Sequence, residues 1–271
     1  MTRSLEHPAY GALLRQWRRW RRLSQWDLSL GTGVSARHLS FLETGRAQPS
    51  REMVLRLCDH LDVPVRERNA LLLAAGYAPT YSHRALDDPQ LHRVRAAVGL
   101  VLAAYAPHPA LVVDRLWDLV AANATVSVLT DGVAAHLLEP PVNVLRLSLH
   151  PDGLAGRIGN LGQWRAHVLD RLAREAAATA DPQLHSLHRE LLGYPGGLER
   201  RHDDLAVAVP LRLWTRHHDL AFLSTVTTFG TAVDVTVAEL SIEAFLPADD
   251  ATARAVALLV ADDARPHEVA V

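Results

Sequence analysis

Residues 23–45 read LSQWDLSLGTGVSARHLSFLETG, and this stretch decides the fold of the amino-terminal part of the chain. Ser24 is a good N-cap for a short helix that runs to about Leu30, and Ser35 caps a second short helix. A glycine follows each helix, at positions 33 and 45, where a left-handed backbone is least costly. Two capped helices joined by a four-residue turn that contains glycine predict a helix-turn-helix unit.

Three further helices flank this unit. The stretch 10–22 places Leu14, Trp17 and Arg21 on one helical stripe and other arginines over the rest. After the unit, Ser50 caps a helix over residues 51–61, and Pro64 precedes another over residues 66–75. About five helices therefore fill residues 1–78, which predicts an all-α domain.

The charge of the chain is unevenly distributed. All 28 basic residues are arginine; residues 1–83 hold 12 of them against 7 acidic residues, while residues 84–271 hold 16 against 23. A basic module on an acidic body indicates a polyanionic partner for the first module. A short capped helix exposing Arg37, His38 and Phe41 suits the major groove of DNA, about 12 Å wide. Double-stranded DNA is therefore the predicted partner.

The same residues carry a resemblance to a known family. The quoted stretch, followed by PSREMVLRLCDHLDVP at 49–64, resembles the lambda-repressor-like (XRE) helix-turn-helix proteins over residues 8–75. The resemblance implies that the recognition helix begins at Ala36, with Ala36, Arg37 and Phe41 facing bases. It places four residues nearer the phosphates: Gln25, Ser35, Ser40 and Arg46. Two positions depart from the family pattern: Arg22 stands where a glycine is usual, and Phe41 replaces a polar residue.

Two residues of this module are predicted to act within the domain. Glu43 carries a charge that DNA repels, so it is expected to hold parts of its own domain together rather than to read bases. Cys58 lies on the inward stripe of its helix, which favours a small core residue over a redox sensor.

A second domain is expected over residues 91–265, after a linker at 79–90 and before a tail at 266–271. A helix over 91–105 precedes two strands, ALVVD and WDLVAAN, and Asn123 is then expected to cap a helix. Asn160 and Asp181 are expected to cap two more helices. Three strand-like runs follow, at 206–215, 220–228 and 232–245, and a last helix is expected at about 250–261. The order predicts an α+β domain with a five-stranded antiparallel sheet, helices on one face, and a cavity between them.

Three stretches of this domain resemble a second family. They are PPVNVLRLSLHPDG at 140–153, NLGQW at 160–164 and STVTTFGTAVDVTVAEL at 224–240. Together with the helix-turn-helix, they are similar to the MmyB-like regulators, whose carboxy-terminal domain is a PAS-like ligand-binding domain. The resemblance implies a transcription regulator whose ligand is a fatty acid or a similar long-chain amphiphile.

A ligand of that kind needs a partner for its polar head and apolar walls for its chain. Arg146 projects from an apolar segment, with Asn143 and His150 nearby, and is the candidate partner for an anionic head. An ion pair with one of the acidic residues explains Arg146 as well. The candidate tunnel walls, which core packing explains equally well, are Leu111, Val113, Trp117, Leu119, Phe222 and Phe245.

Other functions lack a pattern to support them. No HExxH, CxxC, GxSxG or Walker A motif occurs, so neither a metal site nor a catalytic residue is predicted, and no cofactor is required beyond a possible bound fatty acid. Because one recognition helix covers few bases, we expect a homodimer on an inverted repeat. The lone cysteine and the lack of a long apolar run or apolar leader favour a cytoplasmic protein without a membrane span. The alternatives are a second domain that only dimerises or binds a protein and, less favoured, an enzyme of lipid metabolism.

Overall fold

The computed structural model of the chain describes residues 9–179, 181–199, 209–215, 218–229 and 234–263. The chain divides into two compact units, Met1–Ala85 with Thr231–Ala238, and Leu86–Gly230 with Glu239–Val271. The break after Ala85 falls inside the linker expected at 79–90. The sequence did not indicate that residues 234–238 group with the first unit.

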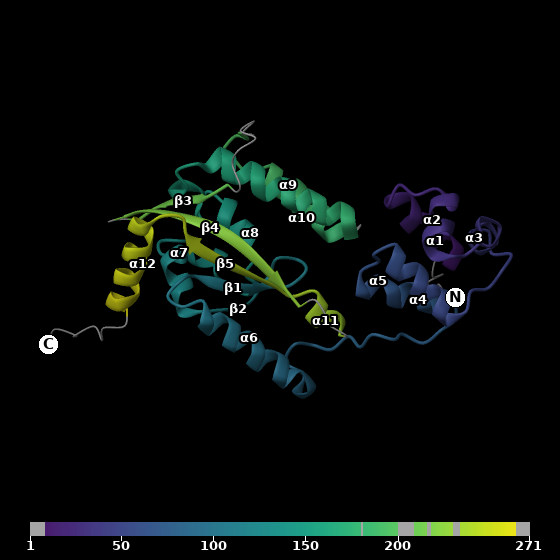
Figure 1. Cartoon of the computed structure of the whole chain (residues 1–271). Helices are drawn as coiled ribbons and strands as arrows, with labels where there is room; N and C mark the ends of the chain where they lie inside the picture. The colour runs from purple at the N-terminus through teal and green to yellow at the C-terminus, as the bar shows by residue number, and fades with distance from the viewer. Residues whose placement is uncertain (1–8, 180, 200–208, 216–217, 230–233, 264–271) are drawn as a thin grey trace, which may run out of the picture. The chain divides into compact units, whose positions relative to one another are not determined.

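The first unit contains the predicted helix-turn-helix within a group of five helices (Figure 1). Their bounds are α1 Tyr10–Trp20, α2 Gln25–Thr32, α3 Ala36–Glu43, α4 Arg51–His60 and α5 Val65–Ala74. The Ser24, Ser35 and Ser50 side chains each accept a hydrogen bond from the third residue of the helix that follows, as the caps predicted from sequence require. Gly33 and Gly45 adopt the left-handed backbone, with φ of 67° and 72°. One apolar face of each helix packs into a shared core that includes Leu14, Leu28, Leu39 and Leu57.

Helix α1 ends in a turn that normally contains glycine. Leu23 N–H donates to the Arg18 carbonyl and Arg22 N–H donates to the Arg19 carbonyl, which is the pattern of a Schellman motif. Arg22 occupies the left-handed position of this motif with a φ of 56°. A residue with a Cβ is strained there, because the Cβ approaches the neighbouring carbonyl oxygen.

Replacing Arg22 with glycine should therefore stabilise the first unit by about 0.5 to 1 kcal/mol, the relief of strain less the added entropy of the unfolded chain. Urea denaturation followed by tryptophan fluorescence measures the change. Arg19→Gly, inside α1, is the matched control and should instead lose about 1 kcal/mol. Equal losses in the two variants would show that Arg22 is not strained.

The second unit is built on a five-stranded antiparallel sheet in the order β2-β1-β5-β4-β3 (Figure 1). The strands are β1 Ala110–Val113, β2 Leu119–Ala122, β3 Leu211–Trp214, β4 Asp219–Thr228 and β5 Ser241–Pro247. Its α-helices are α6 His92–Ala104, α7 Ser127–Thr130, α8 Val144–Leu149, α9 Leu161–Thr179, α10 Pro182–Leu192 and α12 Asp250–Asp263. Short 3-10 turns are η1 Pro89–Leu91, η2 Ala124–Val126, η3 Ala135–Leu137 and η4 Ala155–Arg157. The order of strands and helices agrees with the predicted α+β layout.

Alternate residues of β1 face two different cores. Leu111 and Val113 pack with the intervening helices, including Trp164 of α9 and Leu187 of α10. Ala110 and Val112 pack on the other face with α6. The intervening helices thus cover one face of the sheet, as expected, and α6 adds a cover on the opposite face.

Two asparagines expected to cap helices have long-range partners instead. The Asn123 side chain accepts the Ala110 N–H and donates to the carbonyls of Leu102 and His108, so it ties β2 to the end of α6. The Asn160 side chain donates to the Pro210 carbonyl and accepts the Arg212 N–H, so it anchors β3. Helical segments begin directly after both asparagines, as predicted, but neither side chain caps its helix, because each one satisfies backbone groups of segments that are distant in sequence.

The strand predicted over 232–245 was also partly wrong. Residues Val235–Ala238 form a short helix, α11, and the strand begins at Ser241. The Asp234 carboxylate accepts the Thr236 N–H, the Ser82 hydroxyl and the Arg84 guanidinium, which favours a helical start over an extended chain. Positions 206–208, 217, 230 and 232–233 of the predicted strands and turns, and the tail at 266–271, lie outside the described residues.

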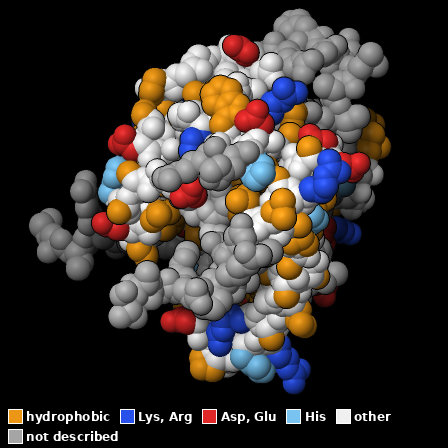
Figure 2. Space-filling model, turned by 90° about the vertical axis from the view of Figure 1, so that its left-hand side faces the viewer, with side chains coloured by type: hydrophobic (Ala, Val, Ile, Leu, Met, Phe, Trp, Pro, Cys, Tyr) orange, Lys and Arg blue, Asp and Glu red, His pale blue; other side chains and the backbone are white. Residues whose placement is uncertain are grey.

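None of the described helices combines the length and the apolar character that crossing a membrane requires. Figure 2 shows a face of the second unit on which acidic, basic and hydrophobic side chains are interspersed.

Candidate functional site

Helix α3 presents a short exposed face beside its N-terminus. Leu39 and Leu42 are buried, which turns the other side of the helix outward. On that side Arg37 is exposed, and Ser40 and Phe41 are half-buried; Ala36 and His38, also half-buried, lie at its edges. The Arg37 guanidinium lies 5.5 Å from the centre of the Phe41 ring, a cation–π contact that holds the arginine along the helix. The arrangement offers one cationic fork and an aromatic edge on a single helical face.

The four residues expected nearer the phosphates have different surroundings. Ser35 accepts the His38 N–H as an N-cap, and Arg46 is exposed. The Ser40 side chain is half-buried on α3. The Gln25 side-chain amide donates to Glu43 at 2.9 Å, so this amide is already engaged within the domain. That any of these residues contacts DNA stays a prediction.

Glu43 holds the three helices of this face together. Its carboxylate is buried and accepts hydrogen bonds from Arg18 (2.6 and 2.9 Å), Arg15 (3.3 Å) and Gln25. Burial alone would raise the pKa of Glu43, but the hydrogen bonds from Arg18, Gln25 and Arg15 outweigh it and lower the pKa below its usual value. The predicted intradomain role of Glu43 is confirmed.

Cys58 lies in the core of the first unit, as predicted. Burial raises the pKa of its thiol to about 12, so the reactive thiolate is scarce at neutral pH.

A cavity of about 280 Å³ lies within the second unit. Fifteen of its twenty lining residues are apolar, and they come from the sheet, from α7 to α9 and from the segments beside them. The polar lining residues are Thr130, Ser148, His167, Arg171 and Glu243. An apolar space with few polar groups is the usual form of a small-molecule site, although the volume of this one lies just below the usual range of about 300 to 1,000 Å³.

The residues expected to form the tunnel are divided between the cavity and the core. Leu111, Trp117, Leu119 and Phe245 line the cavity. Val113 and Phe222 are buried in the adjacent core and are not among the lining residues. Whether the four lining residues contact a ligand stays a prediction.

Arg146 lies outside the cavity lining and pairs with an acidic residue, the alternative that the sequence left open. Its Nε and Nη2 atoms donate to the two carboxylate oxygens of Glu190 on α10, at 2.7 and 2.8 Å. Tyr194 donates to the same carboxylate, and the hydrogen bond from Arg146 is the main cause of a lowered pKa for Glu190. Asn143 caps α8 and His150 ends it, so neither lines the cavity.

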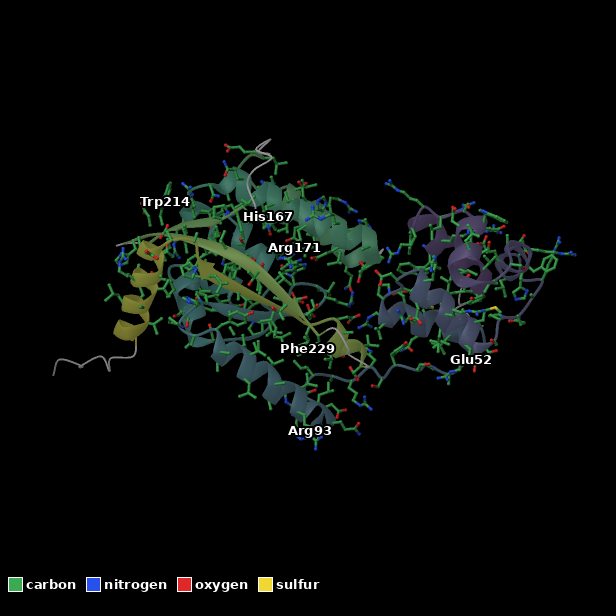
Figure 3. All side chains as sticks on the ribbon, viewed as in Figure 1. Glu52, Arg93, His167, Arg171, Trp214 and Phe229 are labelled. Carbon is green, nitrogen blue, oxygen red and sulfur yellow. The ribbon has the colours of Figure 1, made fainter. Side chains whose placement is uncertain are left out.

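The sequence did not indicate the charged groups of the cavity. Arg171 donates to Glu243 at 3.0 Å and to Glu175 at 3.1 Å, and its guanidinium lies 4.3 Å from the centre of the Trp117 ring. Figure 3 shows His167 and Arg171 projecting from α9 on the side of the sheet. Because Glu243 lies on β5, 72 positions beyond Arg171, no local spacing in the sequence links them.

One group of side chains has the spacing of metal ligands. Ligand atoms of His136, His150 and Asp152 lie within 4.8 Å of one another. His136 and Asp152 are exposed, and His150 Nδ1 already accepts the Asp152 N–H. These three residues are the ones, within the described ranges, that could hold an ion.

Comparison with known proteins gives two matches. The model of the MmyB-like transcription regulator ligand binding domain matches residues 94–259, more than half of the chain. The model of a helix-turn-helix domain matches residues 9–71. No curated protein matches the chain.

Proposed function

Because the chain belongs to the MmyB-like transcription regulators, we propose that it binds double-stranded DNA through α3 and alters this binding when a small apolar ligand fills the cavity of the second unit. The observation that carries the proposal is that one chain combines a capped helix-turn-helix with a largely apolar cavity. Ligand and DNA then influence each other only as far as the ligand binds one state of the chain more tightly than the other.

On DNA, Arg37 is the proposed base-reading residue. Its guanidinium can donate two hydrogen bonds to guanine, while Ala36 and Phe41 can touch a thymine methyl group. The DNA backbone on either side is within reach of four residues near the start and end of α3: Ser35, His38, Ser40 and Arg46. Gln25 is the first residue of α2, so its backbone N–H can donate to a phosphate. We propose that a homodimer places two such helices on an inverted repeat, about one helical turn apart, in the cytoplasm.

In the cavity, the proposed ligand is a fatty acid or a related amphiphile. Each methylene group transferred from water to the apolar walls contributes about 0.8 kcal/mol. At about 280 Å³ the cavity lies just below the usual size range of ligand sites, which favours a short chain.

Titration of the full chain against DNA tests this function. Fragments that the protein selects from a random pool are labelled, and binding is followed by anisotropy at several salt concentrations. Arg37→Ala should lower discrimination between the selected sequence and single-base variants by about 1 to 3 kcal/mol at one base pair.

The matched control is Arg56→Ala, which removes an exposed arginine of α4 and should leave both affinity and discrimination unchanged. Unchanged discrimination in Arg37→Ala would remove Arg37 from base reading. Failure of the parent protein to retain any fragment at low salt would overturn the proposed function.

A further inference from the structure

The polar end of the cavity has an excess of negative charge. Arg171 is the cationic residue of the lining, and it is shared between Glu243 and Glu175. Glu175 is held in turn by the Trp117 indole N–H at 2.9 Å. One guanidinium therefore faces two carboxylates, and its positive charge is already neutralised. A carboxylate head in this place would add a third negative charge in a partly desolvated site.

Glu243 also has an unused acceptor. The residue is 7% exposed, and its Oε1 atom accepts hydrogen bonds from Ser224 Oγ at 2.6 Å and Arg171 Nη1 at 3.0 Å. Within the described residues no group donates to its Oε2 atom. This oxygen is not among the fully buried polar atoms that lack a partner, so it keeps accessible surface. Since Glu243 lines the cavity, a ligand can supply the missing donor.

Two neutral polar groups also line the cavity. Ser148 Oγ accepts the Trp164 indole N–H at 3.0 Å, and no described residue accepts the hydroxyl hydrogen of Ser148. Burial lowers the pKa of His167, and the nearby Arg171 and Arg174 lower it further, so its ring is neutral at pH 7. A neutral imidazole has one donor and one acceptor. These groups can bond to both the hydrogen and the oxygen of a ligand hydroxyl.

From these contacts we propose that the ligand carries an uncharged hydrogen-bond donor, a hydroxyl or an amide, at the end of a short apolar chain, and that this donor binds Glu243. The inference rests on the proposed function, because it names the class of ligand for the same cavity. It selects the related amphiphile over the free fatty acid.

Three probes of equal chain length test the head group: octan-1-ol, octanoate and octylammonium. Binding to the full chain at pH 7.5 is measured by calorimetry and by the fluorescence of the tryptophans that line the cavity. Octan-1-ol should bind most tightly, and octylammonium should bind at least tenfold more tightly than octanoate. Octanoate and octylammonium both lose water from a charged head when they bind. The difference between their affinities therefore reports the sign of the charge around the site, and this comparison needs no variant.

Glu243→Gln removes the negative charge and keeps the shape of the side chain. It should reduce the preference for octylammonium over octanoate at least fivefold. The matched control is Glu190→Gln, which alters the Arg146 pair outside the cavity and should leave the preference unchanged.

The outcomes separate the two proposals. If octanoate binds as tightly as octylammonium or octan-1-ol, or if Glu243→Gln folds and keeps the parental preference, the uncharged head is overturned while the ligand site stands. Octylammonium binding more tightly than octan-1-ol would point to a cationic head and also overturn it. If none of the probes binds, the ligand site of the proposed function fails, whereas the DNA titration tests the DNA-binding part separately.

Discussion

Glu43→Gln is expected to lower the free energy of unfolding of the first unit by about 3 kcal/mol. The substitution removes the buried charge that binds Arg18, Arg15 and Gln25. Arg18 is itself largely buried, with 11% of its side chain exposed, so the variant leaves a guanidinium without its counter-charge. Urea denaturation followed by tryptophan fluorescence measures the loss, since Trp17 lies in the same core.

The control for this prediction is Glu52→Gln, an exposed residue of α4 labelled in Figure 3, which should change stability by less than about 0.5 kcal/mol. The pH dependence supplies a second measurement. Because the pKa of Glu43 is lowered in the folded chain, the ion pair stabilises the fold above the unfolded pKa of about 4.3 and is lost as the pH falls through the lower folded value. The variant should therefore lose less stability than the parent on acidification. If Glu43→Gln and the parent were equally stable at pH 7 and equally sensitive to acid, the stabilising role of Glu43 would be contradicted.

Phe222→Ala is expected to destabilise the second unit by about 3 to 5 kcal/mol, the range for a fully buried phenylalanine. Phe222 lies on β4 with 0% of its surface exposed, and its ring packs edge to face against Phe245 at 6.4 Å. Truncation leaves a void in the core next to the cavity. Because Phe222 does not line the cavity, the head-group preference of the remaining folded protein should not change.

Two further variants serve as comparisons for Phe222→Ala. Leu223→Ala, the next residue of β4, is 38% exposed and should cost less than about 1 kcal/mol. Phe245→Ala removes a lining residue, so it should lower the affinity for octan-1-ol as well as the stability. Chemical denaturation and calorimetry of all three variants distinguish core packing from ligand contact. A loss in Phe222→Ala no larger than that in Leu223→Ala would show that Phe222 is not part of a tightly packed core.

Local chemistry explains which predictions were confirmed. A serine side chain reaches a backbone N–H three residues away, so Ser24, Ser35 and Ser50 mark helix starts whatever surrounds them. The same reasoning located the helical starts after Asn123 and Asn160 but not the partners of their side chains, since a side chain that can cap a helix can equally bind another segment. Glu43 was placed correctly because its charge disfavours contact with DNA, a property of the residue itself.

The cavity shows where such reasoning ends. Arg146 and Arg171 are both arginines beside leucines, and nothing in their local sequence separates the one that meets Glu190 from the one that meets Glu243. The choice depends on how α10 and β5 pack against α8 and α9, and therefore on contacts between residues more than 40 positions apart.

The sequence by itself determined the capped helix-turn-helix, the order of strands and helices in the second unit, and the two families that the chain resembles, because these follow from interactions within a few residues and from apolar periodicity. Only the tertiary structure decided which cation lies at the cavity, that Glu243 keeps a free oxygen there, and that Phe222 belongs to the core rather than to the lining. The physical reason is that the environment of a buried charge or ring is set by the segments folded around it, and those segments are distant along the chain.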